Sequence, residues 1–98
     1  MKNIISDLNK AFENRVRLGI MSILIVNDDV DFNTIKETLN LTDGNLASHL
    51  KALESIEYIF MSKEFVGRKP RTSYSATESG RIAFKLHLNA LEKLIRGG

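Results

Sequence analysis

One stretch in the middle of the chain decides the fold: Leu41-Thr42-Asp43-Gly44-Asn45-Leu46-Ala47-Ser48-His49-Leu50-Lys51-Ala52-Leu53-Glu54. Leu46, Leu50 and Leu53 recur at helical spacing and define one apolar face. Thr42 precedes them as an N-cap, and Asp43 stands in the first turn, where a carboxylate interacts favourably with the helix dipole. The stretch therefore predicts a helix from Asp43 to about Ile56 with one buried side.

A second short helix is predicted immediately upstream. Phe32, Ile35 and Leu39 lie at helical spacing, which indicates a helix over Asn33 to Leu39. The three residues Asn40-Leu41-Thr42 separate it from the next helix. Two short helices joined by a tight turn form a helix-turn-helix pattern.

Two further helices are predicted before this pair. The first covers Asn3 to Phe12, begins at Ser6 or Asn3, and carries an apolar stripe of Ile4, Ile5, Leu8 and Phe12. The second is capped by Asn14 and runs to about Val26, and it is apolar almost all round, which indicates a central helix. A polar turn, Asn27-Asp28-Asp29, ends it, and a strand fragment follows at Val30-Asp31-Phe32.

The pattern changes after Glu57. Aromatic and β-branched residues on both sides of Gly67-Arg68-Lys69-Pro70-Arg71 predict a two-stranded hairpin from about Ile59 to Thr77. Thr77 then caps a long final helix from Glu78 to about Arg96. The elements together predict an α+β fold, a winged helix-turn-helix that is mainly α with a β wing of two to three strands, in a single domain of residues 1–98.

The helix that begins after Thr42 has a polar side opposite its leucines. Small and hydrogen-bonding side chains of this kind suit phosphates and base edges in a major groove about 12 Å wide. An ordinary solvated helix face is the alternative. His49 lies on the flank of the helix, where it either contacts a phosphate or packs at the turn, and His87 is expected at an interface or on the surface. The candidate DNA contacts on this helix are Thr42, Gly44, Asn45, Ser48, His49, Lys51 and Ser55.

The charge is small in sum but concentrated in the hairpin. Fourteen Lys and Arg against twelve Asp and Glu give a formal net charge of +2. Arg68, Lys69 and Arg71 fall within four positions, followed by Thr72, and no acidic residue occurs between Phe65 and Thr77. Cations on a mobile tip beside a polar helix fit a duplex backbone, since each neutralised phosphate releases counterions. The alternative is a solvated basic turn, and the acids Asp28, Asp29 and Asp31 are expected away from any DNA.

Composition excludes several other classes. The chain has no Cys and two His, so we expect no metal site, no cofactor and no thiol chemistry. The longest apolar stretch, Leu18 to Val26, is too short to cross a bilayer, which predicts a cytoplasmic protein without a membrane segment. No phosphate loop or nucleophile motif supports an enzyme.

The final helix predicts a homodimer. It carries more apolar surface than one contact with a small core would hide, so a partner helix is the simplest cover. Packing onto earlier helices of the same chain is the alternative. The predicted dimer contacts are Ile4, Ile5, Leu8, Phe84, Leu88, Leu91 and Ile95.

Three segments together resemble the small winged-helix transcriptional regulators related to the MarR and ArsR families. They are Leu41 to Glu54, Phe65-Val66-Gly67-Arg68-Lys69-Pro70-Arg71-Thr72 and Ser75-Ala76-Thr77-Glu78-Ser79-Gly80-Arg81. The resemblance spans about residues 11–85 and implies a dimer that binds operator DNA, with residues 42–55 as recognition helix and 67–71 as wing. This sequence departs from the families at Ile56-Glu57, where they usually have a small residue and Gly. Either a left-handed cap there is strained by up to about 1 kcal/mol, or the helix ends differently.

One rival hypothesis comes from a different class of protein. The same fold also serves as a protein-protein interaction module without DNA binding. The small net charge is compatible with that function, whereas the basic wing argues against it.

Overall fold

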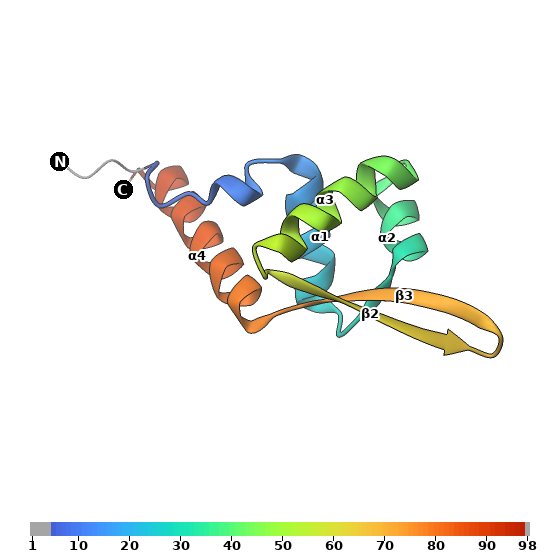
Figure 1. Ribbon diagram of the computed structural model, residues 1–98. Helices are drawn as coiled ribbons and strands as arrows, with labels where there is room; N and C mark the ends of the chain where they lie inside the picture. Colours follow the sequence, from blue (N-terminus) through green and yellow to red (C-terminus); the bar gives the residue numbers. More distant parts are fainter. Residues whose placement is uncertain (1–4, 98) are drawn as a thin grey trace.

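A computed structural model describes residues 5–97 as a helical body with a long β-hairpin wing (Figure 1). In chain order the elements are η1 (Lys10–Phe12), α1 (Arg15–Val26), β1 (Val30–Asp31), α2 (Phe32–Leu39), α3 (Asp43–Ser55), β2 (Ile59–Val66), β3 (Lys69–Ala76) and α4 (Glu78–Ile95). The strands form one antiparallel sheet in the order β1-β3-β2. The predicted winged helix-turn-helix fold is confirmed.

Side-chain caps set the helix starts where the sequence predicts them. The Asn14 side chain accepts hydrogen bonds from the backbone N–H groups of Val16 and Arg17 at the start of α1. Thr42 caps α3 and Thr77 caps α4 in the same way, which satisfies N–H groups that have no partner inside the helix. The predicted limits of these helices are confirmed to within one residue.

The predicted helix over Asn3 to Phe12 is wrong in its described part. Residues 10–12 form a single 3-10 turn, capped by Asn9, whose side chain accepts a hydrogen bond from the Ala11 N–H. The remaining groups of Asn9 bond outside the segment: its N–H donates to His87 Nδ1 and its side-chain amide to the Tyr58 hydroxyl, both at 3.0 Å. These tertiary hydrogen bonds favour a turn over a regular helix.

His87 is correspondingly a core residue, not the surface or interface residue predicted from the sequence. Its side chain is buried beside Phe12 on the inner side of α4. The Asn9 N–H donates to Nδ1, and this hydrogen bond offsets the free-energy cost of burying a polar ring. His87 thereby fastens the start of the chain to its last helix.

One cluster of buried side chains joins the helices to the sheet. Ile20, Met21 and Leu24 of α1 are completely buried, as the all-round apolar pattern of this helix predicts. The cluster also holds the leucines of α3 and residues from every other element: Phe12, Val30, Ile35, Leu46, Leu50, Leu53, Ile59, Tyr74, Ala76 and Phe84. No helix in residues 5–97 has the length and apolar character to cross a membrane.

The turn after α3 contains a left-handed residue at the position where the sequence has Glu57 in place of the usual Gly. Glu57 has φ 63°, and its N–H bonds to the Glu54 carbonyl while the Tyr58 N–H bonds to the Leu53 carbonyl. This pair of hydrogen bonds is the Schellman motif, which usually places Gly at the left-handed position. The backbone therefore keeps the usual helix end despite the strain at a non-Gly residue.

Glu57→Gly is expected to raise the free energy of unfolding by about 0.5–1 kcal/mol, because Gly adopts positive φ without a Cβ penalty. Glu57→Ala is the matched control, since it removes the same charge and keeps the penalty. Denaturant unfolding of both variants measures the difference. Equal stability of the Gly and Ala variants would show that Glu57 is not strained.

Candidate nucleic-acid interface

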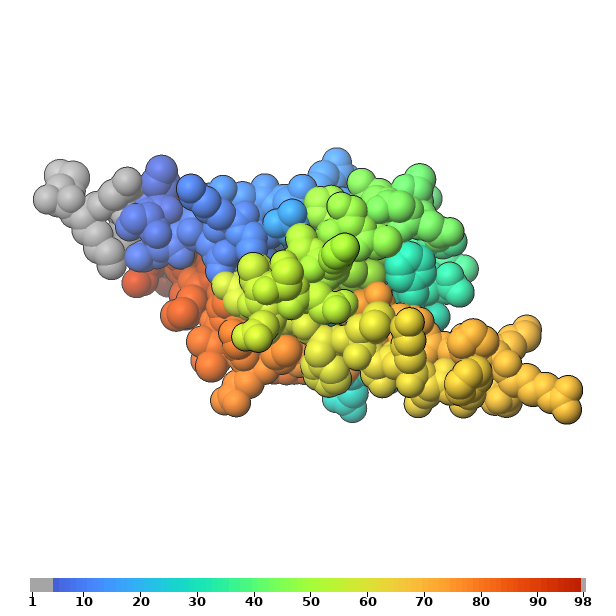
Figure 2. Space-filling model, viewed as in Figure 1, coloured from blue at the N-terminus to red at the C-terminus, as the bar shows by residue number. Residues whose placement is uncertain are grey.

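The exposed side of α3 is held in place by its buried side. Leu46, Leu50 and Leu53 are inserted into the core, so the opposite face points away from the protein. Figure 2 shows α3 as a ridge on the near face of the molecule, beside the root of the wing. The predicted contact residues Thr42, Gly44, Asn45, Ser48, Lys51 and Ser55 are all exposed on or next to this ridge.

Two of these residues are already engaged in hydrogen bonds to the backbone. The Thr42 hydroxyl accepts from the Asn45 N–H at 3.2 Å as the helix cap, and the Ser55 hydroxyl donates to the Ala52 carbonyl at 2.8 Å. Asn45, Ser48 and Lys51 make no side-chain hydrogen bond to another of residues 5–97. Asn45, Ser48 and Lys51 therefore have free polar groups to offer a ligand.

His49 is half-buried against α1. Arg17 Nε donates to His49 Nδ1 at 3.1 Å, so the neutral ring carries its proton on Nε2. Burial lowers the pKa of His49 below its usual value, and the Arg17 charge lowers it further. His49 is therefore a neutral side chain at pH 7, and its Nε2–H is a hydrogen-bond donor.

The wing is a narrow, two-stranded extension that projects beyond the helices (Figure 1). Gly67, with φ 66°, occupies the first position of its two-residue turn, where a hairpin turn of type II′ requires positive φ. Arg68 and Lys69 are exposed at this end, and within residues 5–97 neither forms an ion pair. The structure thus brings two free cations to the tip of the wing.

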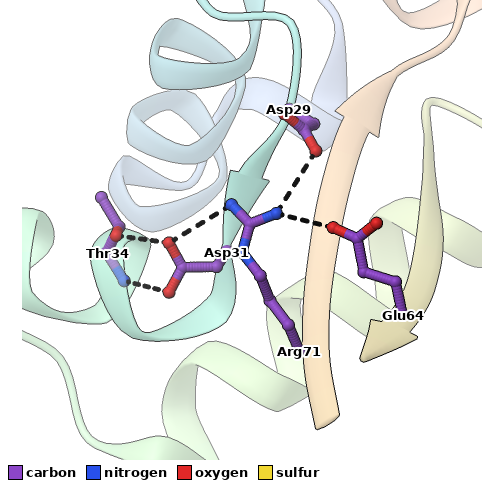
Figure 3. A network of polar contacts seen from close by, with 5 residues as sticks. All are labelled: Asp29, Asp31, Thr34, Glu64 and Arg71. Atoms are coloured by element: carbon purple, nitrogen blue, oxygen red, sulfur yellow. Dashed lines mark hydrogen bonds and ion pairs between the residues drawn. The ribbon is translucent and has the colours of Figure 1, made fainter. Parts of the chain in front are cut away.

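Arg71 is not a third free cation, which the sequence alone did not indicate. Its guanidinium lies 2.9 Å from a Glu64 oxygen, 3.7 Å from Asp29 and 3.9 Å from Asp31 (Figure 3). Asp31 also caps α2 through Thr34, and that hydrogen bonding lowers the pKa of Asp31, with the Arg71 charge as a minor cause. Arg71 therefore joins β3 to β2, to β1 and to the turn before it.

Lys63 is a candidate that sequence reasoning missed. It is exposed on β2 directly opposite Thr72, another predicted contact, which is half-buried on β3. Both residues line a surface cleft of about 450 Å³ with Phe32 and Asn33 at the start of α2. The strand alternation would have placed Lys63 on this side of the hairpin, but only the register shows that it is opposite Thr72.

The predicted dimer contacts divide into exposed and buried residues. Phe84 is in the core with its ring edge-to-face against Phe12, at a centroid distance of 5.3 Å, so it is unavailable to a partner. Leu88 and Ile95 remain exposed along one side of α4, together with Ile5 near the N-terminus, while Leu8 and Leu91 are half-buried. Ile4 lies outside the described residues. Ile82 and Leu86, which are also exposed, lie on another side of the helix.

Comparison with known proteins gives related sequences and folds. The sequence model of the family described as "Winged helix DNA-binding domain" matches residues 16–95. An uncharacterized protein of Methanocaldococcus jannaschii is 38% identical over 85 residues, which is 87% of this chain and 92% of that protein.

Solved structures show the same architecture. A transcriptional regulator homologue from Pyrococcus horikoshii superposes with a TM-score of 0.85 at 34% identity, covering 96% of this chain and 91% of that one. Diamide-treated YodB from B. subtilis superposes with a TM-score of 0.77 at 20% identity, over 88% of this chain and 84% of that one. At 20% identity the similarity to YodB concerns the fold alone.

Proposed function

Because this chain belongs to the winged helix DNA-binding domain family, we propose that it is a transcriptional regulator that binds operator DNA as a homodimer. The observation that carries the proposal is the position of two free cations, Arg68 and Lys69, on a wing that projects beside the exposed polar face of α3. No acidic side chain of α3 lies between Asp43 and Glu54, so the middle of that face offers no charge that repels phosphates.

In this proposal α3 enters the major groove as the recognition helix. Asn45 and Ser48 have free hydrogen-bonding groups for base edges, and Lys51 has a free ammonium for a phosphate or a guanine. Gly44 allows the backbone to approach closely, and His49 donates from Nε2 to a flanking phosphate. At one end of the helix Thr42 contacts a phosphate, since its hydroxyl accepts from the Asn45 N–H and keeps its own proton to donate. At the other end Ser55 contacts the DNA backbone by moving its hydroxyl proton from the Ala52 carbonyl to a phosphate.

The wing then contacts the duplex next to the recognition helix. Arg68 and Lys69 neutralise phosphates, and Thr72 with Lys63 supports that contact from the side of the hairpin that faces α2. Arg71 acts indirectly in this arrangement. Its single positive charge offsets part of the negative charge of Glu64, Asp29 and Asp31, and its ion pairs fix the direction of the wing relative to β1 and α2.

The dimer would form through the exposed apolar side of α4. Leu88 and Ile95 are 45% and 85% exposed, and with the half-buried Leu91 they form an apolar stripe along one side of α4, as at many protein–protein contacts. Two-fold pairing through this side would place two recognition helices about 34 Å apart, one turn of the duplex, and would require an operator with two-fold symmetry.

A Leu88→Glu/Ile95→Glu variant is expected to be a folded monomer, because both side chains are exposed and charges would oppose apolar pairing. Sedimentation equilibrium at micromolar concentration compares it with the wild type and with Leu86→Glu, which alters another side of α4. A monomeric wild type would contradict the dimer. A monomeric Leu86→Glu variant beside a dimeric double variant would place the interface elsewhere on the helix.

Duplex binding should weaken steeply with salt, and Arg68→Ala/Lys69→Ala should flatten that dependence. Each phosphate contact that is lost reduces the log–log slope by about 0.9, because fewer counterions are released on binding. Fluorescence anisotropy with a labelled duplex at several salt concentrations measures both slopes. A wild-type protein without affinity for duplex at low salt would instead support the protein-protein interaction module.

A further inference from the structure

The outer part of the wing carries an aromatic side chain that the proposed contacts leave unused. Phe65 is 75% exposed, next to Val66 at 60%, although Phe is among the residues most often buried in proteins. It lies on β2 directly opposite Pro70 on β3, one residue from the turn. A large apolar ring is thus placed by the strand register near the end of the hairpin, far from the core.

The register shows which side of the wing Phe65 occupies. The pairs Ile59 with Ala76 and Met61 with Tyr74 begin this side, and three of these four residues are buried against the body of the protein. Side chains alternate along a strand, so the same side continues outward through Lys63 and Phe65. Phe65 therefore points to the side of the hairpin on which the helices lie.

Charge is distributed unequally between the two sides of the hairpin. On the side of Phe65 the outer positions are Lys63, Thr72 and Pro70, and none is acidic. The one carboxylate of the hairpin, Glu64, lies on the other side and is paired with Arg71 at 2.9 Å. Phe65 therefore shares its side of the hairpin with Lys63. The acid of the cleft on that side, Asp31, lies 3.9 Å from the Arg71 guanidinium.

An exposed apolar ring among cations matches the chemistry of the minor groove. Phosphates line both edges of that groove and attract the cations, while its floor consists of stacked base pairs that apolar side chains such as Phe, Leu and Pro can enter and partly unstack. We propose that Phe65 is a wedge that inserts into the minor groove of duplex DNA beside α3 and kinks the bound duplex. This inference rests on the proposed DNA binding. It makes Phe65 a specificity-determining residue, because flexible base steps cost less free energy to kink than stiff ones and would be preferred at the wedge.

The test compares Phe65→Ala with Phe60→Ala. Phe60 is 51% exposed on the same strand but on the opposite side of the hairpin, so its removal controls for the loss of an exposed ring. The probe is a duplex with a sequence enriched from random DNA, labelled at its ends with a donor and an acceptor dye. Affinity is measured by anisotropy across a salt series, and the bend by energy transfer between the dyes.

Phe65→Ala is expected to weaken binding at least tenfold and to reduce the bend. The log–log salt slope should stay unchanged, because Phe carries no charge and releases no counterion. Phe65→Leu should retain most of the bend, since Leu also serves as a wedge, and Phe60→Ala should behave like the wild type. Circular dichroism confirms folding of each variant.

Three results would overturn the inference. Unchanged affinity and bend for Phe65→Ala, with salt-dependent binding by the wild type, would refute the wedge and leave the proposed function intact. If Phe65→Ala bound vesicles of anionic lipid more weakly than the wild type but bound duplex DNA equally well, Phe65 would be assigned to a membrane surface. Absence of any duplex binding by the wild type would refute the proposed function and the wedge together.

Discussion

Gly80→Ala is expected to lower the free energy of unfolding by about 3 kcal/mol or more, at the upper end of what over-packing costs. A Cβ atom at this position would lie 2.1 Å from the carbonyl oxygen of Tyr58, 2.9 Å from its carbonyl carbon and 3.0 Å from its Cα. All three contacts are to backbone atoms, so no side-chain rotation relieves them. Either α4 or the turn after α3 must move.

The close approach at Gly80 exists because α4 begins on top of that turn. The Thr77 N–H donates to the Tyr58 carbonyl at 3.0 Å, and the Thr77 hydroxyl donates to the Glu57 carbonyl at 2.6 Å. The same hydroxyl accepts from the Gly80 N–H at 2.9 Å. One threonine thus caps α4 and fixes it to the end of α3, which leaves room for no side chain at Gly80.

Gly44→Ala is the matched control for this prediction. Gly44 also lies in the first turn of a helix, but nothing is within 4 Å of its Cβ position. Ala is the better helix former there, so the control is expected to raise the free energy of unfolding by up to about 1 kcal/mol. Thermal or denaturant unfolding gives both values. A Gly80→Ala variant as stable as the wild type would contradict the packing at the start of α4.

Ser48→Glu is expected to lower duplex affinity at least 100-fold, which corresponds to about 3 kcal/mol of binding free energy. Ser48 is exposed near the middle of α3, on the face proposed to enter the major groove. A carboxylate there would be forced close to phosphates, and like charges brought together at an interface cost several kcal/mol. The fold should be unaffected, because the Ser48 side chain takes no part in the core.

Ser22→Glu adds the same negative charge at an exposed position on α1 and controls for the change in net charge. It is expected to bind nearly as well as the wild type, because α1 takes no part in the proposed contact. Anisotropy at one low salt concentration measures all three proteins. Equal losses for Ser48→Glu and Ser22→Glu would remove α3 from the interface.

The sequence predicted best those elements whose local signals agree with their tertiary contacts. Asn14, Thr42 and Thr77 are strong N-caps, and the apolar spacing after each one matches the face that the structure buries. The hairpin limits followed from turn residues and β-branched residues. The sequence left two ends open for α3, a strained left-handed cap or a different helix end, and the structure has the first because a non-Gly residue can still make the backbone hydrogen bonds that set it.

The sequence failed where partners distant in the chain decide the outcome. Asn9 and His87 are 78 residues apart, so no local sequence pattern predicts their hydrogen bond. That bond favours the short turn at Lys10–Phe12 over a longer helix. Arg71 looked like a free cation because its local sequence has no acid after Phe65. Its partners Asp29 and Asp31 reach it through the pairing of β1 with β3, which the sequence leaves open.

Selection of bound sites from random duplex DNA tests the central claim most directly, because one measurement reports binding, symmetry and spacing. A homodimer that inserts α3 into the major groove is expected to enrich an inverted repeat whose half-sites have centres about 10 base pairs apart. The same selection with Ser48→Glu should enrich nothing. Failure of the wild-type protein to enrich any sequence at low salt would contradict the account of this chain as a regulator that binds an operator.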